Sequence, residues 1–205
     1  MDQTPRLPAF GAWDDVEFQP ILAPTIDIAG SAGRQIEGFL DVAHFAFVHL
    51  ETFGDPGNTA VPAYSVATTP TGGLHVEYAS TVSNVPKGFQ HDTPPGFQWL
   101  RVFDVYPPFA ARLIVHFPGA GQLWILNAPC PVSAKSCRLF VPIERNFNKD
   151  GPVEDVHDFN LKVFNEDRVM VEAQTPEELP LDLREEIHIP ADRTSSSPIA
   201  LSRRR

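Results

Sequence analysis

The chain has 205 residues, of which 42% are hydrophobic and 20% are charged, a composition typical of a globular protein with one domain. Its 26 acidic and 16 basic residues give a formal net charge of −10, which argues against a nucleic acid or an anionic membrane as partner, because both attract basic surfaces. We find no secretory signal at the start of the sequence, and no apolar stretch approaches the roughly 18 residues of a membrane span. The two cysteines are too few for a disulfide scaffold, so we expect a cytoplasmic protein.

The first predicted helix follows an extended lead-in. Residues 1–30 are rich in proline and small residues, and they predict no packed element. From Gln35 to Leu50, apolar residues recur at steps of three and four, which is the pattern of an amphipathic helix. The sequence GDPGN at residues 54–58 is a turn signal that closes this region.

Five β-rich segments come next, separated by turn clusters at the spacing of an antiparallel meander. We expect strands over residues 74–78, 100–106, 111–117, 122–126 and 137–143. A long helix is then predicted from Val153 to Gln174 by an apolar stripe of Val156, Phe159, Val163, Phe164, Val169 and Met170. Residues 194–205 are expected to form a disordered tail. This order of elements predicts an α+β domain whose antiparallel sheet curls around the final helix.

The first candidate functional motif is a D-x2-H-x4-H pattern among apolar neighbours, formed by Asp41, His44 and His49. A buried imidazole needs a partner for its polar nitrogens, and a divalent metal ion is one such partner. Residues five apart on an ideal helix lie about 140° apart, so the helix must be irregular if both histidines bind one ion. The alternative is two unrelated histidines with separate hydrogen-bond partners.

A carboxylate that could complete such a site lies on the predicted long helix, where Glu166 and Asp167 are rival candidates. Asp167 is one turn from Val163 and Val171, on or near the inward stripe. Two histidines and one carboxylate from two elements form the facial triad typical of non-haem Fe(II) oxygenases. Three protein ligands leave the opposite face of the iron open for dioxygen and a substrate. The residues by themselves leave the choice between the two acids open.

Two motifs together resemble a known family. They are DVAHFAFVHLETFGDP at residues 41–56 and FNEDRVMVEAQ at residues 164–174. They are similar to the catalytic domain of Rieske non-haem iron oxygenase alpha subunits, in the branch that contains vanillate O-demethylase-like enzymes. The resemblance covers residues 30–193 and implies a helix-grip domain, in which an antiparallel sheet wraps around a long C-terminal helix.

The resemblance also implies ligands and a reaction. His44, His49 and Asp167 match the iron ligands of the family, and Asp41 matches the carboxylate that bridges the iron site to the cluster of a neighbouring subunit in a homotrimer. Independently, a carboxylate one turn before His44 is well placed to orient its imidazole. The implied reaction is activation of dioxygen, followed by hydroxylation or oxidative demethylation of an aromatic or cyclic substrate.

The chain departs from the family in lacking the Rieske motifs. Neither cysteine belongs to a C-x-H or C-x2-H pair, so this chain has no ligands for a 2Fe–2S cluster. We expect residues 1–30 to be a remnant after a missing Rieske domain and residues 31–193 to be the mononuclear-iron catalytic domain. The cluster would act in trans, on a Rieske partner with its reductase, and the chain alone is expected to be inactive in steady turnover.

Two other functions stay open on the sequence. One is a metal-free module of the same fold that binds a small molecule in an apolar cavity. The other is a truncated relic that folds without catalysing a reaction. His116 is the one other histidine that we consider as a pocket residue, and Trp124, Phe103 and Phe159 line either a pocket or the core.

Overall fold

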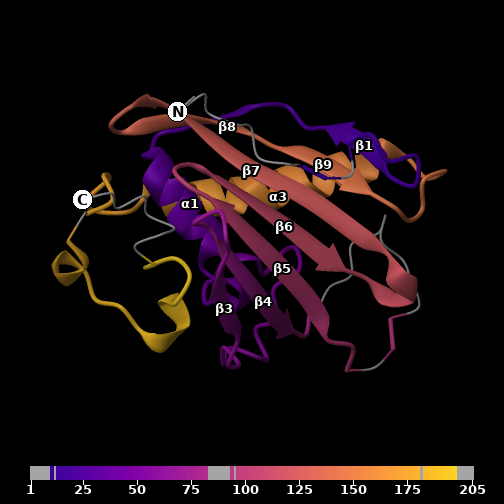
Figure 1. Cartoon of the computed structure of the whole chain (residues 1–205), viewed down its shortest axis with the longest axis horizontal. Coiled ribbons are helices and arrows are strands. Elements are labelled where there is room, and N and C mark those ends of the chain that lie inside the picture. The colour runs from indigo at the N-terminus through magenta and orange to yellow at the C-terminus, as the bar shows by residue number, and fades with distance from the viewer. Residues whose placement is uncertain (1–9, 12, 83–92, 95, 181, 198–205) are drawn as a thin grey trace.

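The computed structural model describes residues 10–11, 13–82, 93–94, 96–180 and 182–197. Figure 1 shows a long helix, α3, running behind the central strands of an antiparallel sheet, with α1 beside it. The strands are β1 (Gln19–Leu22), β2 (Ile26–Ile28), β3 (Ser65–Thr68), β4 (Leu74–Ser80), β5 (Trp99–Tyr106), β6 (Ala110–His116), β7 (Gln122–Ser133), β8 (Ser136–Phe140) and β9 (Pro142–Arg145). The helices in the described part of the chain are α1 (Ala32–Leu40), α2 (Phe45–Val48) and α3 (Val153–Glu172), and 3-10 turns lie at Pro118–Ala120, Leu183–Glu185 and Pro190–Asp192. No helix in the described part of the chain is long and apolar enough to cross a bilayer.

The sheet has the strand order β1-β9-β7-β6-β5-β4-β3, and β8 pairs with both β2 and β7. Strand β7 changes partner along its length. Its residues 123–125 pair with β9, and its residues 128–133 pair with β8. One strand therefore joins two branches of the sheet. Helix α1 packs against both β7 and β8 and also contacts α3, so it closes one end of the core.

The core lies between the sheet and the helices. Buried and more exposed side chains alternate along β4, where Leu74, Val76 and Tyr78 face inward. The buried positions of α3 recur at steps of three and four, and they are Val156, Asn160, Phe164, Asp167 and Val171. Two members of this stripe, Asn160 and Asp167, are polar, which is costly in an apolar core unless partners are present. They indicate where the core meets a functional site.

The structure corrects the prediction for the N-terminal lead-in. Residues 1–30 were expected to contain no packed element, but β1 and β2 join the sheet, and Ile21 and Ile26 are buried in the core. Both strands are short, and Pro20 sits in β1, which among the described strands pairs only with β9, so that a missing N–H is tolerated there. Their isoleucines do pack in the core, but strands of four and three residues are too short for the alternation of buried and exposed positions to stand out in the sequence.

Two predictions for the C-terminal part also need correction. Val169 was placed in the inward stripe of the long helix, but 67% of it is exposed. The expected disordered tail is ordered at its start, where Thr194 and Ser195 are buried and the Ser196 N–H donates to Asp192 O at 2.9 Å. A polar segment that packs through its own hydrogen bonds carries no apolar pattern to reveal it. The remainder of that predicted tail, 198–205, lies outside the described residues.

A buried acid on the outer face of the sheet leads to a pH prediction. Glu144 on β9 has no exposed surface, and neither carboxylate oxygen has a hydrogen-bond partner among the described residues. Burial raises the pKa of Glu144 to about 7, against the opposing effect of Arg112. The unfolded chain releases this proton at about pH 4.3. The native state should therefore lose stability as pH rises from that value through 7, because the unfolded state then binds fewer protons.

Glu144→Gln is expected to remove this loss of native-state stability at rising pH. The free energy of unfolding, measured by urea denaturation, should fall less between about pH 5 and about pH 8 in the variant than in the wild type. Glu154→Gln, at an exposed position of α3, is the matched control and should keep the wild-type pH dependence. If Glu144→Gln also kept it, Glu144 would ionise as freely as an exposed acid.

Candidate metal centre

The two histidines of the motif approach each other because the helix that carries them is broken. Helix α1 ends at Leu40, and Asp41 follows with an extended backbone at φ −74° and ψ 124°. His44 then begins the single turn of α2, and His49 ends it. This is the irregularity that the five-residue spacing requires if both imidazoles are to reach one point.

The loop after α2 is held against it by a glycine. The Gly54 N–H donates to His49 O at 2.8 Å, and a Cβ atom at this position would lie 2.3 Å from Phe45 O. No side chain fits in that space, so the close approach itself requires glycine. The contact fixes the end of α2 and with it the position of His49.

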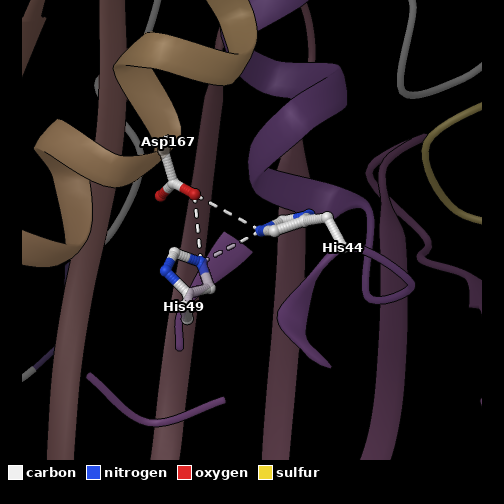
Figure 2. A group of neighbouring side chains, drawn as sticks. All are labelled: His44, His49 and Asp167. Atoms are coloured by element: carbon white, nitrogen blue, oxygen red, sulfur yellow. Dashed lines mark hydrogen bonds and ion pairs between the residues drawn. The ribbon is translucent and has the colours of Figure 1, made fainter. Parts of the chain in front are cut away.

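His44, His49 and Asp167 converge on one point inside the protein (Figure 2). His49 Nε2 lies 3.0 Å from Asp167 Oδ1 and 3.1 Å from His44 Nε2, and His44 Nε2 lies 3.3 Å from Asp167 Oδ1. The three residues are buried, with 8%, 1% and 7% of their surface exposed. Asp167 reaches the histidines from α3, so the structure brings together the three residues that the sequence singled out as metal ligands.

Two further carboxylates hold the outer nitrogens of the histidines. Asp41 Oδ2 lies 3.2 Å from His44 Nδ1, and Glu166 Oε2 lies 2.8 Å from His49 Nδ1. The hydroxyl of Thr52 also donates to Glu166 Oε2, at 2.7 Å. A carboxylate on Nδ1 favours the tautomer that carries its proton there, which turns the lone pair of Nε2 toward the centre of the site.

Glu166 and Asp167, the rival acids of the sequence, lie in different places. Neighbouring residues on a helix point about 100° apart. Asp167 Oδ1 therefore faces both Nε2 atoms, whereas Glu166 reaches the outer nitrogen of His49. The sequence reasoning missed this supporting position of Glu166. The Glu-Asp doublet is the signal that could have found it, because adjacent helical positions favour one carboxylate inside the site and one beside it.

The centre of the site favours a positive charge. Asp167 Oδ1 is buried, and no hydrogen bond of normal geometry reaches it from the described residues. Burial lowers the pKa of His44, but the carboxylates of Asp167 and Asp41 outweigh it and raise that pKa to about 9. Burial raises the pKa of Asp167, but the imidazoles of His44 and His49 outweigh it and lower that pKa to about 2. The carboxylates thus make the centre of the site favourable for a positive charge, and a metal ion bound there would take the place of the proton on His44.

The donor set fits a divalent iron ion. Two neutral imidazoles and one carboxylate are the ligands of the facial triad, and no thiolate is among them. Ligand atoms at neighbouring corners of an octahedron lie about 3 Å apart when the bonds to the metal are about 2.1 Å. The separations of 3.0 to 3.3 Å between the three ligand atoms agree with that arrangement.

A largely apolar cavity borders the three residues. Side chains from β5, β6, β7 and α3 line it, and its aromatic lining consists of Phe39, Phe45, Phe53, Trp99, Phe103, Phe117, Phe159 and Phe164. Besides the histidines and Asp167, its polar lining residues are Arg101 and Asn160. The sequence reasoning singled out neither, since an isolated arginine in a strand and an asparagine in a helix carry no motif.

The other pocket candidates from the sequence have mixed outcomes. Phe103 and Phe159 do line the cavity. Trp124 packs instead against Phe18 of the N-terminal segment, with ring centroids 5.4 Å apart. His116, at the end of β6, is not among the described residues that line the cavity.

Known proteins share this sequence and fold. Residues 28–197 match the family described as the vanillate O-demethylase oxygenase C-terminal domain. The methylxanthine N1-demethylase NdmA of Pseudomonas putida is 28% identical over 198 residues, which cover 93% of this chain and 51% of the relative. The methylxanthine N3-demethylase NdmB of the same organism is 30% identical over 176 residues, covering 85% and 47%. The chain thus spans about half the length of these relatives.

Solved structures agree with the sequence match. Pseudomonas putida NdmA with caffeine has a TM-score of 0.75 at 26% identity, covering 93% of this chain and 52% of that one. Dicamba monooxygenase bound to dicamba, at 14% identity, shares the fold with a TM-score of 0.70, over 92% of this chain and 58% of that one. The predicted α+β helix-grip fold is confirmed. The chain belongs to the vanillate O-demethylase oxygenase C-terminal domain family, the Rieske oxygenase catalytic domains that its two motifs resemble.

Proposed function

We propose that this chain is the mononuclear-iron catalytic domain of a Rieske-type oxygenase that demethylates or hydroxylates an aromatic or cyclic substrate. The observation that carries the proposal is the buried triad of His44, His49 and Asp167 beside an apolar cavity. Family membership and the demethylases among the relatives support the same class of reaction. A metal-free carrier of this fold would have no use for three buried ligand groups that two further carboxylates support.

In this proposal each residue of the site has a defined task. His44, His49 and Asp167 hold Fe(II), which when bound supplies the reduction of dioxygen and the oxidation of a nearby C–H bond. Asp41 and Glu166 keep the protons of the imidazoles on Nδ1 and so keep Nε2 available to the metal. The apolar side chains of the cavity exclude water and hold a flat substrate ring.

The electrons have to come from outside this domain. Oxidative removal of a methyl group consumes dioxygen, two electrons and two protons, and it releases formaldehyde, water and the demethylated product. We assign the electrons to a Rieske partner and its reductase acting in trans on the catalytic domain, residues 31–193. Asp41 would pass them to the iron site from a neighbouring subunit of a homotrimer, since its carboxylate contacts His44 and is 25% exposed.

Hydrogen peroxide allows the proposal to be tested on the chain alone, because peroxide equals dioxygen plus two electrons and two protons. We expect the iron-loaded chain to release formaldehyde from members of a panel of methoxy- and N-methyl-substituted aromatic compounds. The metal-free and zinc-loaded chains should release none. Stoichiometric iron binding without formaldehyde or a hydroxylated product from any compound would leave a non-catalytic relic. Failure of the folded chain to bind iron would favour the carrier.

A further inference from the structure

The lead-in crosses the outer face of the sheet as a strap, which we define as residues 10–11 and 13–18. Phe18 packs edge-on against Trp124 of β7, with ring centroids 5.4 Å apart. At the other end of the strap, a Cβ atom on Gly11 would lie 2.7 Å from Cζ3 of Trp124, so the backbone touches the same ring. Gly11 also has a φ of +69°, a conformation that favours glycine. Both ends of the strap therefore rest on one indole ring.

Glu144 lies beside Trp124 and beneath this strap. The two residues are opposite partners in the pairing of β9 with β7, so their side chains share the outer face of the sheet. None of the surface of Glu144 is exposed, and neither carboxylate oxygen has a hydrogen-bond partner among the described residues. A buried carboxyl group without partners is tolerated as the neutral acid, whereas its ionised form is costly. The closed strap therefore favours a protonated Glu144.

Two of the three charged groups that the described residues place around Glu144 also oppose its ionisation. Burial raises the pKa of Glu144 to about 7, and although Arg112 on β6 opposes this shift, Asp14 and Asp15 on the strap add to it. The Arg112 guanidinium is itself paired with Asp104, at 2.5 Å from Nη2 to Oδ2. The residues that pair with Glu144 on β1 and β7, a proline and a tryptophan, carry no charge. Ionisation would thus set three carboxylates against one guanidinium that already has an acidic partner.

Little apolar burial holds the strap closed. Val16 is 87% exposed, and Trp13 is 41% exposed. Lys149 Nζ donates to Val16 O at 3.4 Å and lies 3.9 Å from Glu17 Oε2, an exposed contact of the kind that contributes little to stability. A segment held in this way opens at low cost in free energy while the rest of the protein stays folded.

We propose that the strap is a pH-sensitive latch, which lies closed on the sheet while Glu144 is protonated and is released when Glu144 ionises. Once the strap is open, water reaches the carboxyl group, which then gives up its proton at about pH 4.3. The closed form therefore loses stability relative to the open form as pH rises from that value through 7, because the open form binds fewer protons. Opening relieves the cost of the buried charge without unfolding the sheet. The latch involves no residue of the proposed iron site, so its test is independent of the proposed function.

Acrylamide quenching of tryptophan fluorescence measures the opening of the strap. The Trp13→Phe chain is used, because it retains Trp99, which is buried in the core, and Trp124, against which the strap packs. Between about pH 5 and about pH 8 the opening equilibrium should shift by roughly 10- to 100-fold, and we expect the quenching constant to rise at least about 2-fold. Far-UV circular dichroism should stay unchanged. A quenching constant independent of pH, or a rise accompanied by loss of the sheet signal, would overturn the proposal.

Variants in the same background assign the opening to Glu144. Glu144→Gln is neutral at every pH, so its quenching constant should stay low throughout. Replacing Asp14 and Asp15 together by asparagine removes the repulsion from the strap and should make the rise smaller. The matched control is His75→Gln, which should keep the full rise, because His75 titrates near neutral pH on the same face but pairs with Asp104, at 2.7 Å. A full rise in Glu144→Gln would contradict the latch. If that variant failed to fold, an undiminished rise in the double asparagine variant would contradict it instead.

Discussion

Replacement of Asp167 by alanine is expected to abolish stoichiometric Fe(II) binding. Asp167 supplies the one carboxylate among the three convergent groups, and its oxygen lies 3.0 Å and 3.3 Å from the two imidazole nitrogens. Without it, two neutral imidazoles remain to hold a doubly charged ion in a buried site, so we expect at least about 100-fold weaker binding. Anaerobic titration with Fe(II), followed by metal analysis of the desalted chain, measures this directly.

Three further variants provide the reference affinities for the Fe(II) titration. Asp158→Ala removes a largely exposed acid from the same helix and should bind iron like the wild type. His44→Ala should lose iron as Asp167→Ala does. Glu166→Gln should weaken binding by about 10-fold, because it loses the charge that supports His49 but keeps a hydrogen-bond acceptor. If Glu166→Gln lost iron completely while Asp167→Ala retained it, the two acids would have exchanged roles.

Asp41→Asn is expected to uncouple electron supply from the iron site. The Asp41 carboxylate contacts His44 Nδ1 and also accepts a hydrogen bond from the Ala43 N–H at 2.8 Å, and asparagine can keep the second contact. Iron affinity should fall by about 10-fold, as in Glu166→Gln, whereas peroxide-driven demethylation at saturating iron should remain close to wild type. Turnover driven by a reduced Rieske partner should fall by about 10- to 100-fold, the usual cost of losing a carboxylate that supports a metal-bound histidine.

Comparing the peroxide-driven rate with the rate driven by a reduced Rieske partner shows whether Asp41 takes part in electron supply. Glu51→Gln is the control, because Glu51 lies on the same segment but is largely exposed and pairs with Lys162 at 2.8 Å. It should leave both rates unchanged. If Asp41→Asn lost iron and both activities together, Asp41 would serve only to orient His44. If both activities stayed at the wild-type level, Asp41 would have no part in electron supply.

The fold class was predictable because local patterns encode which side of an element faces the core. The alternation over residues 74–78 and the three- and four-residue steps after Val153 both reflect burial on one side, and the structure has a strand and a helix there. Strand β3 was not predicted, because none of its four side chains is buried and no alternation marks it. It is held by pairing with β4, which is a property of the folded sheet.

His44 and His49 were singled out by the sequence because a metal centre needs particular side-chain types, and the family resemblance chose Asp167 over Glu166 as the third candidate ligand. Only the tertiary structure decided that Glu166 supports His49 from outside the triad. It also decided that the chain breaks after Leu40. The contact between Glu166 and His49 joins residues 117 positions apart in the chain. Local patterns record which face of an element is buried, whereas distances between remote segments exist only once the sheet has closed over α3.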